Sequence, residues 1–482
     1  MLENLNPKSV FKYFEEISSI PRGSKNEKSI SDYLVDFAKK HSLEYIQDEF
    51  LNVIIKKPGT NGYENSKTVI LQGHMDMVCE KNSTSTHDFS SDPISLRIDG
   101  DFIYADNTTL GADNGVAVAY SLAILESSNI PHPPLEVLIT TEEEIGMGGA
   151  INLSDNLLNG EIMINIDSEE EGCLLVSCCG GIKTSITLPL EYTTLDNTYT
   201  SLNLSLTGLK GGHSGMDIIK QRGNANIILG RILSSAVNQG YNLFISDFNG
   251  GSKMNAIPRE AFSNIAIKSA VLEDFITKCT DIFNRIKSEY IGVDDNIKFN
   301  ITKNNTEKLF LTKSSSLNVI NSLTLIPNGV ITMSNQIEAL PVSSTNLGVV
   351  TTSKGSIMLE SALRSSSASL KEHLVNIHKS VATTLNGKID FEGDYPEWEY
   401  EVNSPLRNVF INVYKDMFNS EPKISAIHAG LECGIIKSKY KNLDIISFGP
   451  DHFDVHSPSE HLSISSTERM YNYLLNVLKE LK

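Results

Sequence analysis

The hydrophobic pattern of the first 183 residues alternates between short apolar runs and longer stretches with one apolar face. Four runs are nearly continuous in apolar residues, as expected for buried strands: 51–57, 68–73, 135–141 and 163–167. Three stretches have the spacing and length of helices: 8–20, 27–40 and 115–127. Ser24 and Glu27 have the spacing of a capping box, so we expect Ser24 to cap the second helix. Alternating strands and helices predict an α/β fold.

The middle of the chain has the same kinds of element but more Thr, Ser and Asn. One set of segments comprises 201–209, 225–237, 263–269 and 272–290, and a second comprises 317–325, 345–353, 356–366 and 369–387. The first style then returns with a helix, a strand and a closing helix at 404–418, 443–449 and 467–481. We therefore predict a catalytic domain in two parts, 1–183 and 400–482. An inserted domain, 184–399, made of a duplicated α/β unit, separates them.

Composition and charge narrow the class of protein. A length of 482 residues predicts two or three domains. The hydrophobic fraction of 40% is typical of a soluble globular protein, and no apolar run reaches the ~18–20 residues of a membrane span. The net charge of −18 argues against nucleic acid or a membrane as a partner. No secretory signal is visible and the six cysteines form no framework, so we expect a cytoplasmic protein with reduced thiols.

The apolar run 68–73 leads directly into His74 and Asp76. Residues i and i+2 of a strand point to the same side, so these two side chains can converge. A carboxylate beside an imidazole fixes the tautomer, which suits a metal ligand or a general base. Taken alone, however, the pair is more simply a surface His beside an Asp.

Other acidic or histidine residues also follow predicted strands or occupy loops. Asp113 lies in a glycine-flanked loop, three glutamates occupy 142–144, Asp167 ends a strand, and His452 and His456 share a loop. Each has a simpler interpretation alone, as a helix cap, a solvated acidic run, a turn residue or a loop histidine. Ligands bind at the carboxyl ends of strands in α/β sheets, and so many metal-type ligands there are not expected by accident. Histidines and carboxylates without Cys suit zinc, with manganese or cobalt as substitutes.

Six motifs occur in order along the chain: GHMDMV, GADNG, TEEEIGMGGA, NIDSEEEG, HAGLECG and HSPSE. Together they resemble the signature of the aminoacyl-histidine dipeptidases. These are carnosinase-like members of the dinuclear zinc peptidase family that includes aminoacylases and glutamate carboxypeptidases. The resemblance implies a zinc-peptidase catalytic domain with a central mixed sheet flanked by helices, and an inserted α/β lid domain of two similar halves. It also implies two zinc ions per chain and hydrolysis of short peptides, Xaa-His dipeptides among them.

The resemblance implies a role for each metal-type residue. His74 and Asp167 would bind one zinc ion, and Glu144 and His456 would bind the other. Asp113 would bridge the two ions. In members of this family the peptide bond after the bridging carboxylate is cis, so we expect the same after Asp113.

Two residues next to the expected metal ligands are implied in catalysis. Asp76 resembles the carboxylate that orients His74. Glu143 resembles the general base. The three consecutive glutamates leave the register open, but the family pattern E-E-(A/I)-G-M favours Glu143 over Glu142.

The inserted domain would supply the remaining substrate contacts. His213 in GGHSG and Asn255 in NAIP resemble residues that stabilise the developing oxyanion, and Arg364 resembles the residue that binds the substrate carboxylate. Turn or surface roles stay open for all three. Glu432 in HAGLECG could bind the substrate ammonium group or be a buried structural glutamate. Because the two halves of the inserted domain look complementary, we expect each chain, as a monomer or homodimer, to build its own complete site.

Two other functions stay open. A sister hydrolase, such as a deacylase of N-acyl amino acids or a tripeptidase, fits the core motifs equally, and only HAGLECG and the long inserted domain disfavour it. A non-catalytic binding protein with the same fold is disfavoured by the intact set of ligand-type residues with Glu143. Dipeptides, an acetylated amino acid and a tripeptide would distinguish the three.

Overall fold

The structure is a computed structural model that describes residues 2–304 and 309–482, and the chain divides into two compact units. The first unit comprises Met1–Ser177, Tyr400–Ala426 and Leu431–Lys482, and the second comprises Cys178–Glu399 and Ile427–Gly430. The first boundary was predicted after residue 183, but the first strand of the second unit already begins at Gly180. The assignment of residues 427–430 to the second unit was not predicted.

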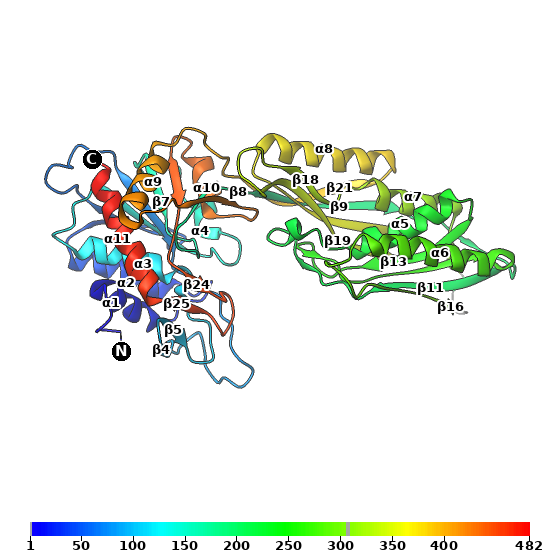
Figure 1. The fold of residues 1–482 in the computed structure, drawn as a ribbon, viewed down its shortest axis with the longest axis horizontal. Coiled ribbons are helices and arrows are strands. Elements are labelled where there is room, and N and C mark those ends of the chain that lie inside the picture. Colours follow the sequence, from blue (N-terminus) through cyan, green and yellow to red (C-terminus); the bar gives the residue numbers. More distant parts are fainter. Residues whose placement is uncertain (1, 305–308) are drawn as a thin grey trace. The chain divides into compact units, whose positions relative to one another are not determined.

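The first unit is built around an eight-stranded mixed sheet (Figure 1). Its strands, in spatial order, are β1 (Glu44–Gln47), β2 (Val53–Lys57), β6 (Leu135–Thr140), β3 (Val69–His74), β7 (Ile162–Asn165), β23 (Asp444–Ser447), β8 (Cys173–Cys178) and β22 (Lys423–Ile427). The central strands β6, β3, β7 and β23 run parallel, whereas β1, β2 and β8 pair antiparallel with their neighbours. The predicted mixed sheet is confirmed.

Helices and a small second sheet complete the first unit. The helices are α1 (Lys8–Ser18), α2 (Lys28–Lys40), α3 (Ala112–Glu126), α4 (Gly148–Asn152), α9 (Pro405–Phe418), α10 (Glu432–Lys439) and α11 (Ile464–Glu480). Helix α3 is buried almost all round because it packs between β3 and α1. The small sheet has the order β24 (His452–Phe453), β25 (His461–Ser463), β5 (Phe102–Ala105), β4 (Leu96–Asp99), so β24 and β25 flank the loop that carries His456.

The second unit contains a nine-stranded antiparallel sheet with two halves of the same strand order. The first half is β16 (Lys298–Asn304), β11 (Tyr199–Thr207), β15 (Ala261–Lys268) and β13 (Leu243–Gly250). The second is β21 (Lys388–Tyr395), β9 (Gly180–Pro189), β20 (Ser356–Ser365) and β19 (Pro341–Ser353), with β18 (Gly329–Met333) beside β19. Numbered along the chain within each half, both read 4-1-3-2. The halves meet where β13 pairs with β19.

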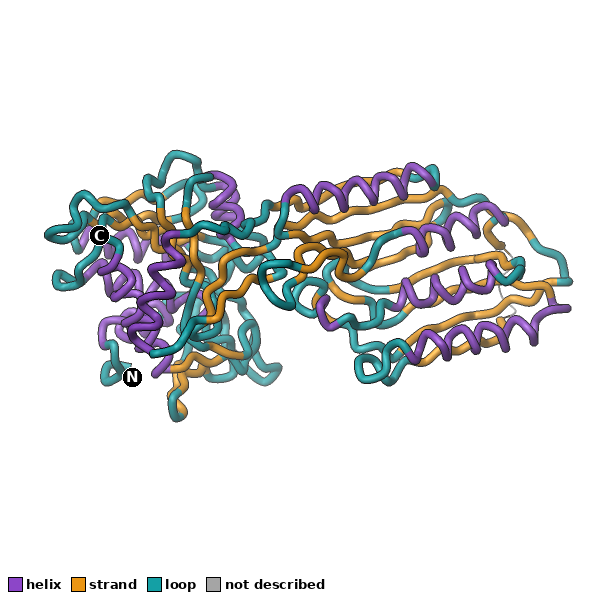
Figure 2. Tube along the Cα trace, turned by 45° about the horizontal axis from the view of Figure 1, so that its top comes forward, coloured by secondary structure: helices purple, strands orange, loops and turns teal. Residues whose placement is uncertain are grey.

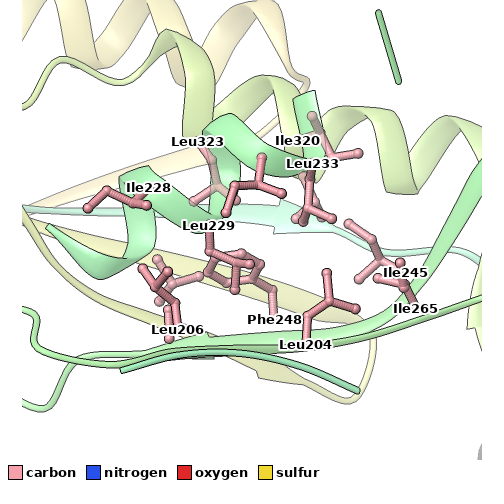
Figure 3. Close-up of a cluster of buried hydrophobic side chains, with 14 of the residues drawn as sticks. Leu204, Leu206, Ile228, Leu229, Leu233, Ile245, Phe248, Ile265, Ile320 and Leu323 are labelled. Carbon is pink, nitrogen blue, oxygen red and sulfur yellow. The ribbon is translucent and has the colours of Figure 1, made fainter. Parts of the chain in front are cut away.

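Four helices lie on one face of this sheet, as Figure 2 shows: α5 (Ala225–Asn238), α6 (Leu272–Ser288), α7 (Lys313–Leu325) and α8 (Ala368–Thr384). Short pairs complete the unit: β10 (Tyr192–Thr194) with β17 (Leu309–Leu311), and β12 (Gly212–His213) with β14 (Ala256–Ile257). Leucine, isoleucine and phenylalanine side chains from β11, β13, β15, α5 and α7 form the core between helices and sheet (Figure 3). Leu204, Ile228 and Phe248 in this core have no exposed surface.

Candidate active site

Two parallel strands and the start of α3 bring three ligand-type residues of the first unit to one place. His74 is the last residue of β3, Asp167 lies two residues beyond β7, and Asp113 lies at the start of α3. His74 Nε2 lies 3.0 Å from Asp113 Oδ1 and 3.5 Å from Asp167 Oδ1. The strand-end geometry therefore brings these three predicted residues together. The peptide bond between Asp113 and Asn114 is cis, as expected.

The other oxygen of Asp113 faces a second histidine–carboxylate pair. His456 Nε2 lies 3.1 Å from Asp113 Oδ2 and 3.0 Å from Glu144 Oε2. One carboxylate thus stands between two groups, each with one histidine and one further carboxylate. The neighbouring His452 is buried, and its ring nitrogens have no hydrogen-bond partner among the described residues.

The electrostatics of this cluster demand positive charge. Burial alone would lower the pKa of His74, but the carboxylates of Asp167, Asp113 and Asp76 outweigh it and hold that pKa well above its usual value. Hydrogen bonds with Asp113 and Glu144 raise the pKa of His456 to about 11. Burial raises the pKa of Asp167 to about 6 although His74 opposes the shift. Carboxylates packed this closely repel one another unless a cation or a proton lies between them.

The residues present fit a pair of divalent cations. Ligand atoms of His74, Asp113 and Glu144 all lie within 4.8 Å of one another. Glu144 Oε1 is buried and has no hydrogen-bond partner among the described residues, so it has acceptor capacity to spare. Imidazole nitrogens and carboxylate oxygens, with one carboxylate placed to bridge, are a donor set that suits zinc, manganese or cobalt.

Asp76 connects this cluster to the loop of glutamates. Its Oδ1 lies 3.3 Å from His74 Nδ1, the ring nitrogen that faces away from the other carboxylates. The backbone N–H groups of Glu143 and Glu144 donate to its Oδ1 and Oδ2 at 3.1 and 3.3 Å. The hydroxyl of Ser24 donates to Oδ2 at 2.8 Å. Asp76 therefore fixes the histidine and the positions of two glutamates, more than the sequence analysis assigned to it.

The three consecutive glutamates point in different directions. Glu144 reaches His456, whereas the Glu142 carboxylate packs against Gly148 and the Glu142 N–H donates to Glu27 at 3.1 Å. Glu143 lies between them, and burial raises the pKa of its carboxyl well above the usual value. His74 opposes that shift, whereas the carboxylates of Asp167, Glu432 and Asp113 add to it. A strongly shifted pKa in a cluster of charged groups is typical of a residue that transfers protons.

Glu432 lies at the start of α10 and contacts side chains of β3 and β6. Its Oε2 accepts hydrogen bonds of 2.6 Å from both Gln72 Nε2 and Thr140 Oγ1. Its Oε1 is buried and has no hydrogen-bond partner among the described residues. Burial raises the pKa of Glu432 to about 8. The two open roles of this residue, structural or substrate-binding, therefore concern different oxygens of one carboxyl.

The other predicted residues lie in the second unit. His213 on β12 is half-buried, and its partner in β14 is Ala256, which directly follows Asn255. The N–H of His213 donates to Asp217 at 2.8 Å, and its Nδ1 accepts from the N–H of Met216 at 3.2 Å. Burial and the charge of Arg364 lower the pKa of His213, so its imidazole is neutral at pH 7. Asn255 is exposed.

Arg364 on β20 belongs to a row of residues across the second sheet. It is paired with Ser344 on β19 and Gly181 on β9, and Gly181 is in turn paired with Tyr395 on β21. A guanidinium nitrogen of Arg364 donates to the Tyr395 hydroxyl at 2.9 Å. A Cβ on Gly181 would lie 2.6 Å from that hydroxyl, so the glycine makes room for the contact. No carboxylate forms an ion pair with Arg364 among the described residues, which leaves it able to bind an anion.

His428 from HAGLECG packs beside this row. Its Nε2 lies 2.7 Å from Ser344 Oγ, and its Nδ1 lies 2.9 Å from the Cys179 thiol. Burial and the charge of Arg364 lower the pKa of His428 to about 4. The sequence analysis gave this histidine no role, although the motif that contains it was recognised.

Sequence analysis also missed two residues that hold the Asp113 loop. Glu460 ends the motif HSPSE, and its carboxylate accepts hydrogen bonds from backbone N–H groups of that loop. Arg22 is fully buried and donates to the backbone carbonyls of Met75 and Gly111. The position of Glu460 in a recognised motif was the only available signal, and nothing distinguished Arg22.

Comparisons with known proteins agree with this geometry. A model of the peptidase family M20/M25/M40 matches residues 70–480. The chain belongs to this family. It is 39% identical over 483 residues to the cytosol non-specific dipeptidase of Escherichia coli (strain K12), covering 100% of this chain and 99% of that protein.

Solved structures place the fold in the same family. The aminoacylhistidine dipeptidase from Vibrio alginolyticus is 37% identical and has a TM-score of 0.95, covering 100% of this chain and 98% of that one. The aminopeptidase PepT from Bacillus cereus, at 14% identity and a TM-score of 0.57 over 99% of each chain, shares the fold. The predicted family and its fold are confirmed.

Membership of the M20/M25/M40 family settles the reaction class. The chain is a peptide hydrolase of a metal-dependent family, as the sequence analysis predicted. The non-catalytic alternative is therefore set aside. Within the described residues, no helix combines the length and the apolar character needed to cross a membrane.

Proposed function

We propose that this M20/M25/M40 peptidase is a dipeptidase of broad specificity that includes Xaa-His dipeptides among its substrates. The observation that carries the proposal is the carboxylate of Asp113, whose two oxygens each face a separate histidine–carboxylate pair. The full-length similarity to a non-specific dipeptidase and to an aminoacylhistidine dipeptidase supports the choice of substrate. A cytoplasmic location accords with the relative that is described as cytosolic.

We assign two zinc ions to this cluster, with manganese or cobalt as substitutes. His74 and Asp167 would hold one ion, Glu144 and His456 the other, and Asp113 both. Divalent ions held by these residues would lower the pKa of a bound water and polarise the scissile carbonyl. Asp76 would hold His74 Nδ1 as the donor, so that Nε2 keeps its lone pair for the ion.

Glu143 is proposed as the general base and acid. Its backbone is fixed by Asp76, its carboxyl is partly buried, and burial raises the pKa of that carboxyl. The carboxylate would accept a proton from the attacking water and then give it to the departing amine. General acid–base catalysis of this kind contributes roughly 10²–10⁴-fold to the rate.

Residues of the second unit are proposed to bind the substrate carboxylate and the oxyanion that develops during the reaction. Arg364 would bind the carboxylate of the substrate through its guanidinium, which no carboxylate pairs with in the described part of the unit. His213 and Asn255 would donate to the oxyanion as it develops. The neutral state of His213 suits a hydrogen-bond donor that need not release a proton. Glu432 Oε1 would receive the substrate ammonium group.

A sister hydrolase is the alternative to test. Purified protein supplied with zinc or manganese should be offered dipeptides including Xaa-His, a tripeptide and an acetylated amino acid, with ninhydrin-type detection of released amino acids. We expect kcat/KM for dipeptides to exceed that for the other two classes by at least ten-fold. A preference for the tripeptide or the acetylated amino acid would overturn the dipeptidase assignment and leave the peptidase family intact.

A further inference from the structure

The loop that carries Asp113 is held by a carboxylate from the other end of the chain. Glu460 Oε2 accepts hydrogen bonds from the N–H groups of Leu110 and Gly111 at 2.7 and 3.0 Å. Glu460 Oε1 accepts from those of Ala112 and Asp113 at 2.8 and 3.4 Å. These N–H groups precede or open α3, so no helical carbonyl satisfies them. Glu460 is only 2% exposed, so water does not compete for its oxygens.

Arg22 holds the same loop from its carbonyl side. One guanidinium nitrogen donates to the Gly111 carbonyl, and the other donates to the carbonyls of Met75 at 3.0 Å and Asp76 at 3.5 Å. Arg22 therefore connects the Asp113 loop to the segment that follows His74. Burial lowers the pKa of Arg22, whereas the carboxylates of Glu460, Asp76 and Asp113 oppose the shift.

Glycines make room for this arrangement. A Cβ on Gly111 or Gly115 would lie 2.6 or 2.8 Å from a guanidinium nitrogen of Arg22. Gly111 also has φ 70°, a conformation that side chains with a Cβ rarely adopt. The glycines of the motif GADNG thus leave space for the Arg22 side chain. Gly111 donates its N–H to Glu460 and accepts a hydrogen bond from Arg22 at its carbonyl.

We propose that Glu460 and Arg22 form a clamp that presets the bridging carboxylate of Asp113 before any metal binds, an inference that rests on the metal-binding role proposed for Asp113. Both are positioning residues, because they act through the backbone of the loop. Glu460 also lies four residues beyond His456, so the clamp joins the loops that carry the bridging carboxylate and the second histidine. A preset loop lowers the ordering cost of binding two ions.

Glu460→Gln tests the clamp with the smallest change. Each oxygen of Glu460 faces two N–H donors, so the amide NH₂ of Gln must face two donors whichever way it is turned. Asp444→Asn is the matched control, because Asp444 accepts from Ser404 Oγ and the N–H of Leu406 at the start of α9, away from the metal-type residues. Isothermal titration of the chelator-treated proteins with zinc or manganese is the measurement.

We expect wild type and Asp444→Asn to take up two ions and Glu460→Gln to bind at least one of them ten-fold or more weakly. A Glu460→Gln protein that is folded and binds both ions as wild type does would overturn the clamp. Arg22→Lys gives a second test from the carbonyl side, since one ammonium cannot replace the two guanidinium nitrogens that reach the carbonyl of Gly111 and those of Met75 and Asp76, and we expect the same weakening.

Hydrogen exchange on unaltered, metal-free protein keeps the inference testable if both variants fail to fold. The clamp predicts slow exchange of the N–H groups of residues 110–113 without metal, with little further slowing when zinc is added. Fast exchange without metal and protection only with metal would overturn it. Wild type that binds no metal at all would instead refute the proposed metal site, while the exchange of the metal-free protein would still decide whether the loop is preset.

Discussion

At the scale of single residues, Asp76 and Asp113 of the first unit each hold several partners at once. Asp76 binds a histidine, a serine and two backbone N–H groups, and Asp113 divides its two oxygens between His74 and His456. Because every oxygen is committed, replacing one of these residues disturbs several neighbours. Glu143 differs, since Asp76 fixes its backbone, whereas its carboxyl has no hydrogen-bond partner among the residues that the structure describes.

Glu143→Gln should therefore separate catalysis from metal binding. The amide cannot accept a proton from water, so we expect kcat to fall by roughly 10²–10⁴-fold while metal content stays at the wild-type level. Metal analysis and steady-state kinetics on one dipeptide are the measurements. Glu142→Gln is the matched control and should keep kcat within a few-fold of wild type. The opposite result for the two variants would move the base to Glu142.

Sequence reasoning at this scale named residues that lie together in the structure, although their role as metal ligands stays a prediction. His74, Asp113, Glu144, Asp167 and His456 were named from motifs, and the structure places them in one cluster. It failed for Ser24, which was predicted to cap α2. The helix begins after Glu27 without a side-chain cap, and the Ser24 hydroxyl donates to Asp76 instead. Local spacing cannot reveal a tertiary partner that is 52 residues away.

At the scale of elements, the second sheet positions Arg364 through side-by-side strands. The guanidinium crosses Gly181 on β9 to reach the Tyr395 hydroxyl on β21. Nothing in the local sequence relates residues 181, 364 and 395, because their alignment depends on strand register across three strands. Hydrophobic patterns predict that strands exist but not which strands are neighbours.

Tyr395→Phe should weaken substrate binding through Arg364 if that residue binds the substrate carboxylate. Losing one hydrogen bond that orients a charged group should raise KM for dipeptides roughly ten-fold, equivalent to about 1.4 kcal/mol, with kcat little changed. A dipeptide amide, which lacks the carboxylate, should show no such increase. Tyr192→Phe, which loses a hydroxyl contact to Ser353 in the same unit, is the control. An equal rise in KM for the amide would contradict the proposal that Tyr395 orients Arg364 toward the substrate carboxylate.

Helix α8 should make the second unit sensitive to acid through His378. This histidine has no exposed surface, its Nδ1 lies 3.0 Å from Thr184 Oγ1, and burial lowers its pKa to about 4. In the unfolded chain its pKa is about 6.5, so between pH 6.5 and 4 the unfolded state binds more protons. Stability is therefore full above pH 6.5 and is lost as the pH falls toward 4, by roughly 3 kcal/mol for this group.

The measurement is the free energy of unfolding in urea at several pH values between 7 and 4, from a signal that reports unfolding of the second unit. We expect the loss of unfolding free energy with acid to be shallower in His378→Gln than in wild type. His373→Gln changes an exposed histidine of the same helix and should follow wild type. An unchanged pH slope in His378→Gln would show that burial does not hold this imidazole neutral.

At the scale of the whole molecule, the order of elements explains what the sequence could not reveal. The first strand of the second half, β9, precedes the whole first half in the sequence. The chain therefore forms β9, then the strands of the first half, and then the remaining strands of the second half. The two sets of segments predicted from the sequence follow one another along the chain, and β9 belongs to neither of them. The segment 427–430 is a similar case, because four residues of the second unit interrupt the C-terminal part of the first.

The duplication bears on how many chains one site requires. Both halves of the second unit lie in one chain, with His213 in the first half and Arg364 in the second. We therefore expect no complementation between chains. Glu143→Gln and His213→Ala, each inactive alone, should be co-expressed with different tags and purified through both tags, or mixed if no mixed oligomer forms. Activity should stay at the level of the single variants, with a wild-type and Glu143→Gln mixture as the reference for one intact chain. Recovery toward half of the wild-type activity would mean that His213 serves the site of another chain, and the duplicated unit would then not replace a partner subunit.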